Sequence, residues 1–216
     1  MRKDLIAEGL GTAFLLTGVV GSGIMGAALA GDNIAVALLA NAIATGCVLY
    51  VLISVLGPIS GAHFNPAVTL AFWLRGDITT SRASSYALVQ IIGGILGVWA
   101  THLMFDLDLL QLSQTARAGP AQLWSECIAT FGLLFVIFGG LRHSPEAVAT
   151  LVALYITGAY WFTASTSFAN PAVTIARSLS DTFAGITPAH APGFIAAQLI
   201  TAILATYFLR WFFAQD

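Results

Sequence analysis

The chain has 216 residues, of which 58% are hydrophobic and only 8% are charged. Soluble domains carry about 25% charged residues, so this composition excludes an ordinary soluble protein and predicts one that lies in a membrane. The net charge of −2, with no basic tract, gives no reason to expect nucleic-acid binding. The long apolar segments are therefore expected to cross a lipid bilayer.

Six segments are long enough to do so, because a transmembrane helix needs about 20 apolar residues to cross about 30 Å of hydrocarbon. In chain order they are residues 5–29, 34–56, 83–105, 122–141, 147–164 and 192–213. Two further apolar stretches, 66–74 and 171–179, are too short to cross. We expect both to be re-entrant, with their ends surrounded by protein or water.

The same pentapeptide, Asn-Pro-Ala-Val-Thr, opens both short stretches. The two boxes are Asn65-Pro66-Ala67 and Asn170-Pro171-Ala172. Proline suits the first position of a helix, and asparagine just before it is a preferred N-cap. Each box therefore predicts the start of a short helix. Two such starts in matching places indicate half-helices that meet head to head, which is typical of a membrane channel.

The chain is predicted to be one channel domain, residues 1–216, built from an internal duplication. Repeat one covers about 1–110 and repeat two about 120–216. Glu8 is matched by Glu126, and Gln90 by Gln198, each in a similar apolar context. Each repeat holds three spans, an odd number, so the second repeat must insert upside down. Inverted repeats with broken helices at the midplane occur in membrane transport proteins.

Lys and Arg in the short loops predict the orientation. With the N-terminus inside, the cytoplasmic side carries Arg2, Lys3, Arg75, Arg82, Arg142 and Arg210, and the outer side carries Arg117 and Arg177. This excess places both termini in the cytoplasm. Cys47 and Cys127 lie inside apolar spans, so no disulfide framework is expected.

The paired boxes, a glutamate in spans one and four, and the lead-in Ser60-Gly-Ala-His-Phe64 resemble the aquaporins, or major intrinsic proteins, over essentially the whole chain. The resemblance implies an all-α membrane protein with six transmembrane helices and two re-entrant half-helices. It also implies a homotetramer in the lipid bilayer with one pore per subunit, no cofactor, no metal and no enzymatic activity. A bacterial channel of this kind belongs in the inner membrane.

The polar groups near the predicted centre have expected roles. Asn65 and Asn170 cap the two helix ends and can leave amide N–H groups facing the lumen, while the positive helix ends repel cations. Glu8 and Glu126 are either coupling acids of a transporter or acceptors for backbone amides of the loops before each box. The symmetry of acids and loops favours the second interpretation. His63 either packs in its loop or faces the cytoplasmic vestibule.

The outer constriction is expected to be wide. Aquaporins usually have an arginine directly after the second box, where this chain has Val173. Similarity to the family places Thr45, Gly158 and Ser167 at the other constriction positions, a small set without fixed charge. A shift of span five by two or three residues would instead bring Tyr160 or Trp161 into the pore. Arg177 is expected in the outer vestibule, where Asp181 four residues further on could hold it. The alternative is that Arg177 only anchors the helix end to the outer loops.

The sequence thus predicts a passive channel for small uncharged solutes. Bacterial aquaporin-like channels without the filter arginine resemble those associated with arsenic resistance, which suggests arsenite as its neutral hydroxide, along with glycerol and water. A glycerol or water channel without a metalloid role is the alternative within the class. An ion-coupled secondary transporter, which needs acids facing the lumen, and a structural junction-like protein with a blocked pore are the alternatives outside it.

Overall fold

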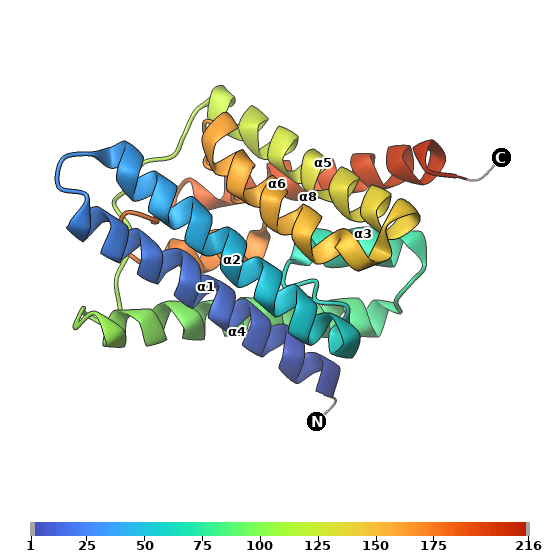
Figure 1. Cartoon of the computed structure of the whole chain (residues 1–216), viewed down its shortest axis with the longest axis horizontal. Coiled ribbons are helices and arrows are strands. Elements are labelled where there is room, and N and C mark those ends of the chain that lie inside the picture. Colours follow the sequence, from blue (N-terminus) through green and yellow to red (C-terminus); the bar gives the residue numbers. More distant parts are fainter. Residues whose placement is uncertain (1–2, 215–216) are drawn as a thin grey trace.

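The computed structural model describes residues 3–214, which form eight α-helices, one short 3-10 helix and no strand. The α-helices are α1 (Lys3–Leu29), α2 (Ile34–Ser60), α3 (Pro66–Arg75), α4 (Thr80–Met104), α5 (Pro120–His143), α6 (Val148–Phe162), α7 (Pro171–Arg177) and α8 (Ala191–Phe212). The long helices lie side by side as one bundle (Figure 1). The short α3 and α7 lie within it.

Within residues 3–214, five helices are long and apolar enough to cross a membrane, namely α1, α2, α4, α5 and α8. The fifth expected span, 147–164, is shorter than predicted, because α6 has only 15 residues. It begins after a 3-10 turn at Pro145–Ala147 and ends at Phe162. There the Thr163 hydroxyl bonds the Ala159 carbonyl and the chain leaves the helix to form the polar loop before α7.

Small residues allow α1 and α4 to pack backbone against backbone. A Cβ atom added at Gly93 would collide with the carbonyl oxygen of Gly9, and one at Gly97 would collide with that of Ala13. Small residues at such contacts are the usual means of helix association in lipid, where no hydrophobic force drives helices together. This close pair fixes Glu8, on α1, next to Gln90, on α4.

The two short helices connect the two halves of the chain. α3, from the first half, packs on α4 and also on α8, and α7, from the second half, packs on α8 and also on α4. Their N-terminal ends approach each other in the middle of the bundle, where Asn65 contacts Ala169. The fold is the expected inverted arrangement of half-helices, and it places the two Asn-Pro-Ala boxes at one point.

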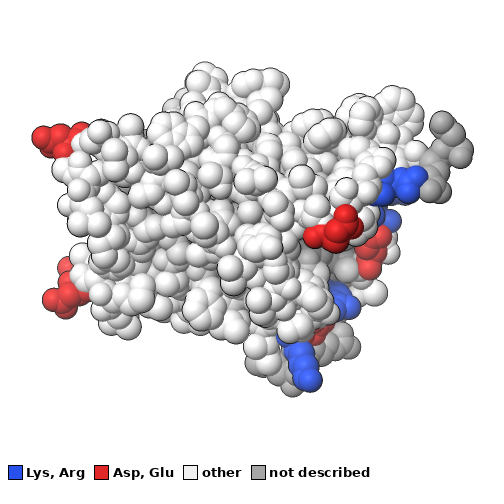
Figure 2. Space-filling view, in the orientation of Figure 1, with Lys and Arg blue, Asp and Glu red and all other residues white. Residues whose placement is uncertain are grey.

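The surface divides into charged ends and an uncharged belt. Figure 2 shows Lys and Arg side chains gathered at one end, acidic side chains at both ends, and neither along the middle of the visible face. The described chain begins and finishes at the end with the basic residues (Figure 1). Large apolar side chains such as Leu96, Ile128 and Leu204 are exposed on the belt, as a lipid-facing surface requires.

Candidate functional site: a central pore

Both boxes start their helices as the sequence predicts. The Asn65 side-chain oxygen accepts from the backbone N–H of Ala67 at 2.8 Å, and that of Asn170 accepts from Ala172 at 2.9 Å and Val173 at 3.2 Å. Both asparagines have extended backbones, and proline follows each as the first helical residue. The side-chain oxygens therefore satisfy amides that no helical carbonyl can reach.

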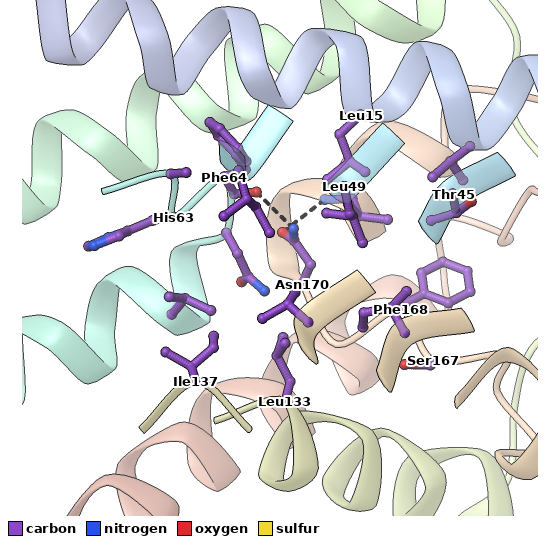
Figure 3. Close-up of a pocket in the computed structure, with 18 of the residues that line it drawn as sticks. Leu15, Thr45, Leu49, His63, Phe64, Leu133, Ile137, Ser167, Phe168 and Asn170 are labelled. Carbon is purple, nitrogen blue, oxygen red and sulfur yellow. Dashed lines mark hydrogen bonds between the residues drawn. The ribbon is translucent and has the colours of Figure 1, made fainter. Parts of the chain in front are cut away.

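The asparagine amides also join the two halves. Asn65 Nδ2 donates to the Ala169 carbonyl at 2.7 Å. Asn170 Nδ2 donates to the Phe64 carbonyl at 2.8 Å (Figure 3). Each amide nitrogen carries two hydrogens, and one of them binds the opposite loop. The N–H that binds the opposite loop serves as a brace, and both asparagines also line the central cavity.

Glu8 accepts hydrogen bonds from the loop before the first box. Its two oxygens accept hydrogen bonds from the Ser60 hydroxyl at 2.7 Å, the His63 N–H at 2.9 Å, the Phe64 N–H at 2.7 Å and the Gln90 side-chain amide at 2.8 Å. Glu8 is fully buried and does not line the central cavity. These are the contacts that the loop-support interpretation requires.

Glu126 makes the equivalent contacts in the second half. It accepts from the backbone of Phe168 at 3.0 Å and Ala169 at 2.8 Å, and from the Gln198 amide at 2.6 Å. The two loops need such acceptors because their backbones leave helical geometry. Several non-glycine residues in them have positive φ, namely Ala62, Phe64, Thr166, Ser167 and Ala169. Such a backbone cannot pair all its amides along a helix. A buried carboxylate from a neighbouring span therefore accepts from two amides in each loop.

A narrow cavity of about 110 Å³ passes between the two boxes. Its wall is mainly apolar, and residues on both sides of the asparagine pair contribute to it, including Leu15, Leu49, Ile53, Val68, Leu133, Ile137, Val148, Val152 and Ile156. Figure 3 shows His63 towards one end, Thr45, Phe168 and Ser167 towards the other, and Asn170 between them. The few polar groups are thus concentrated at the centre and the two ends.

The structure places three of the four expected constriction residues on this cavity. Thr45, Ser167 and Val173 line it, whereas Gly158 does not, and that assignment was wrong. Gly158 lies on an exposed face of α6, while Tyr160 lines the cavity and its hydroxyl lies 3.2 Å from that of Thr45. Residues four apart share a helix face, so the lining row on α6 is the one that contains Tyr160.

The alternative register therefore describes α6 correctly. Val152, Ile156 and Tyr160 line the cavity one turn apart, and Trp161 is 48% exposed on the outer surface. We call the end of the cavity that contains Thr45 and Tyr160 its outer end. This end is narrower than it would be with a glycine in place of Tyr160, and it carries the Tyr160 hydroxyl in addition. No sequence signal distinguishes Tyr160 from Trp161, since both are aromatic residues near the end of an apolar helix.

His63 combines its two proposed roles. Its ring lines the cavity, and its Nδ1 lies 3.1 Å from the Thr69 hydroxyl. The ring also packs on Phe72 with 4.5 Å between centroids and contacts the edge of Tyr86. The loop therefore holds the imidazole in one position at this mouth of the cavity.

Arg177 is buried inside the protein and lines the outer end of the cavity. Its Nε donates to the Ala184 carbonyl, and its guanidinium carbon lies 3.5 Å from the centroid of the Phe168 ring. The expected partner, Asp181, instead accepts from the backbone N–H of Gln114 at 2.8 Å. α7 ends at Arg177, so Asp181 does not follow it one turn along the same helix.

Arg117, which the sequence indicated only as an outer charge, braces the outer loops. Its side chain donates to the carbonyls of Gly185 at 2.8 Å and Ser165 at 3.2 Å, and it lies over the Phe168 ring at 5.1 Å. Burial lowers the pKa of this guanidinium, but arginine stays protonated at any ordinary pH. A positive charge therefore lies behind Phe168, outside the cavity lining.

Across residues 3–214, no group of three His, Cys, Asp or Glu side chains is placed to hold a metal ion. Cys47 and Cys127 are free thiols. Helices long enough to cross a membrane surround the cavity. Two half-helices meet at its centre with their asparagine caps facing each other. These features define a membrane protein with a central pore.

Comparison with known proteins agrees with this class. The family model described as Major intrinsic protein matches residues 1–163. Aquaglyceroporin AqpS of Rhizobium meliloti (strain 1021) is 55% identical over 211 residues, which cover 98% of this chain and 90% of that protein. Aquaporin NIP1-1 of Arabidopsis thaliana is 36% identical over 71% of this chain, which spans about half (54%) of that longer relative.

The fold is also similar to a solved structure. The X-ray structure of the aquaglyceroporin from Plasmodium falciparum matches with a TM-score of 0.74 and 21% identity, covering 95% of this chain and 94% of that one. At this identity the match concerns the fold. Together with the family model, the full-length bacterial relative shows that this chain belongs to the major intrinsic protein family.

Proposed function

We propose that this protein is a passive membrane channel for small uncharged solutes, with glycerol, water and neutral metalloid hydroxides such as arsenous acid as permeants. The observation that carries the proposal is one cavity whose lining includes residues on both sides of Asn65 and Asn170. Its walls near the centre are apolar, so a solute there exchanges hydrogen bonds with water for those of the asparagine amides. Family membership supports the same function.

The positions of the glutamates favour a channel over an ion-coupled transporter. A coupling acid has to face the lumen to exchange its ion, but Glu8 and Glu126 lie outside the cavity lining. Their oxygens are occupied by loop amides and by Gln90 or Gln198. The cavity also extends past the asparagine pair, which argues against a blocked, purely structural protein.

The residues that line the outer end of the cavity determine which solutes we expect to pass. Val173 occupies the position after the second box without a charge, while Thr45, Tyr160 and Ser167 offer hydroxyls. Such a lining admits solutes wider than water that carry hydroxyls of their own. The name of the bacterial relative, an aquaglyceroporin, supports glycerol. The metalloid assignment rests on the resemblance to arsenic-resistance channels and on Val173.

We infer the following assembly and location. The chain is one channel domain made of two repeats, with both termini on the cytoplasmic side of a bacterial inner membrane, and four copies form a homotetramer. The end with the basic residues, where the described chain begins and finishes, supports this orientation (Figures 1 and 2). The tetramer rests on the family resemblance.

Stopped-flow light scattering on proteoliposomes tests the proposed function. Wild-type protein is expected to raise the rates of water efflux and glycerol influx above those of empty liposomes. A low activation energy and indifference to ion gradients are expected, because a channel moves solute without a conformational cycle. Equal rates in liposomes with and without the protein would contradict the proposal. Transport that stops when an ion gradient is collapsed would also contradict it.

Asn170→Asp is expected to weaken the exclusion of cations. A carboxylate next to the start of α7 offsets the positive charge of that helix end, and it replaces the Nδ2 donor that binds the Phe64 carbonyl. Proton and sodium leak into proteoliposomes should rise several-fold, and Asn65→Asp should behave similarly. Normal folding with unchanged leak in both variants would show that the helix ends do not form the barrier.

Tyr160→Ala is expected to widen the outer end, because its ring lines the cavity and its hydroxyl contacts Thr45. Glycerol permeability should rise relative to water in the same stopped-flow assay. The matched control is Trp161→Ala, which removes a neighbouring aromatic from the outer surface. If the Trp161 variant changes the ratio and the Tyr160 variant does not, the register of α6 described above is wrong.

A further inference from the structure

A second cavity lies outside the pore, at the end of the molecule with the basic residues. It is a surface pocket of about 360 Å³, placed where α3, α5 and α8 all finish. The charged side chains in its described lining are Arg75, Arg142, Arg210 and Asp77. Its volume falls within the range of roughly 300–1,000 Å³ in which proteins bind small ligands. We call it the basic pocket, because its arginines outnumber its one acid.

The three helices bring these arginines together from distant parts of the sequence. Arg210, on α8, donates from Nη1 to the Leu74 carbonyl of α3 at 3.0 Å. The guanidinium carbon of Arg75, on α3, lies 4.5 Å from the centroid of the Phe138 ring of α5. The Nε atom of Arg75 lies 2.9 Å from the Asp77 carboxylate. These contacts hold two guanidinium groups at the wall of the same pocket.

Both of these guanidinium groups keep donors that the protein does not use. Each carries five N–H groups, and across residues 3–214 Arg75 and Arg210 form only the polar contacts given above. Pairing the last carbonyls of a helix is the ordinary task of an arginine at a helix end, and one N–H of Arg210 performs it. The planar guanidinium matches the oxygens of a phosphate group, with two parallel hydrogen bonds. The unused donors therefore suit a phosphate group.

The surroundings of the basic pocket favour a lipid phosphate over a soluble one. The rest of the lining is apolar and consists of Phe138, Leu141, Leu209 and Phe213. Next to Arg210 on α8, Trp211 is 73% exposed, and Tyr207, one turn earlier, is 58% exposed. Exposed tryptophan and tyrosine at the end of an apolar helix are typical of the level of the lipid headgroups. The pocket thus places positive charge and an apolar wall beside the lipid-facing surface.

We propose that the basic pocket binds the phosphate headgroup of an anionic phospholipid. Arg75 and Arg210 donate to the phosphate oxygens, and Arg142 adds a third positive charge. The apolar side chains contact the glycerol backbone and the start of the acyl chains. Basic pockets between transmembrane helices are known to bind lipid headgroups. This inference goes beyond the proposed function, since it holds whichever solute the channel passes.

Lipid titration of the full-length protein in a neutral detergent, followed by native mass spectrometry, tests the proposal. Phosphatidylglycerol, which is anionic, should bind with saturation and more tightly than phosphatidylcholine, which is zwitterionic. Arg210→Gln should weaken phosphatidylglycerol binding about fivefold, the loss expected for one basic residue at a lipid headgroup. Asp77→Asn should instead strengthen it, because this variant removes the competing carboxylate and keeps all three arginines. The second variant decides the matter if the first does not fold.

Lys3→Gln is the control. It removes one positive charge from the same end of the molecule (Figure 1), but Lys3 begins α1 and does not line the basic pocket. This variant should bind phosphatidylglycerol as the wild type does. The proposal is overturned if phosphatidylcholine binds as tightly, if Lys3→Gln weakens binding as much as Arg210→Gln, or if Asp77→Asn does not strengthen it. Inorganic phosphate that binds as tightly as the lipid, with the same dependence on Arg210, would identify a soluble phosphate compound as the ligand and refute the lipid assignment.

Discussion

Glu126→Ala is expected to lower the stability of the protein strongly. The substitution leaves the Phe168 and Ala169 amides and the Gln198 side chain without an acceptor. A buried donor without a partner costs roughly 1–3 kcal/mol, so the total is expected to reach several kcal/mol. The thermal unfolding midpoint of the detergent-solubilised protein should fall sharply, and little folded protein should be recovered.

The corresponding glutamine variant distinguishes a structural role of the carboxylate from a role in transport. Glu126→Gln keeps one acceptor oxygen but places an NH₂ group where the second oxygen received a donor, so a smaller loss of stability is expected. Glu8→Ala and Glu8→Gln should show the same order, because Glu8 also accepts two loop amides. If both glutamine variants keep wild-type stability and yet abolish transport, the acids are functional, and the ion-coupled interpretation gains support.

Val173→Arg is expected to have the largest effect on solute selection. Val173 lines the cavity, and Arg177 lies one turn further along α7. A second guanidinium there would occupy the lumen and repel the first. Glycerol and arsenite permeability should fall at least ~10-fold, the effect of about 1.4 kcal/mol on a barrier, while water permeability is largely kept. Stopped-flow light scattering measures water and glycerol, and uptake measures arsenite.

Val173→Leu is the control, since it adds bulk without charge. It should lower glycerol permeability less than the arginine variant does. If Val173→Arg changes no permeability ratio, Val173 does not form the constriction. The Thr45 and Tyr160 pair would then be the narrowest point.

The sequence predicts the centre of this protein well because its chemistry is local. The Asn-Pro-Ala boxes specify their own helix starts, through proline at the first position and asparagine as the cap. The matching positions of Glu8 and Glu126 indicate equivalent roles, and in the structure both residues accept hydrogen bonds from loop amides. Such features depend on neighbouring residues and on symmetry, which a sequence displays directly.

The lining of α6 could not be predicted in the same way. Its inner and outer faces are both apolar, because one meets the lumen and the other lipid. Hydrophobic periodicity therefore does not mark a face, and the spacing carried over from the family missed the row containing Tyr160. The partner of Arg177 could not be predicted, for another reason. The irregular chain after α7 brings Ala184, rather than Asp181, to its guanidinium.

Solute accumulation tests the central claim most directly. Proteoliposomes containing the wild-type protein would receive labelled glycerol under imposed proton or sodium gradients, with empty liposomes as the control. The passive-channel account predicts rapid uptake that stops at the external concentration, whatever the gradient's size or direction. Glycerol accumulated above the external concentration, and lost when the gradient is collapsed, would contradict it.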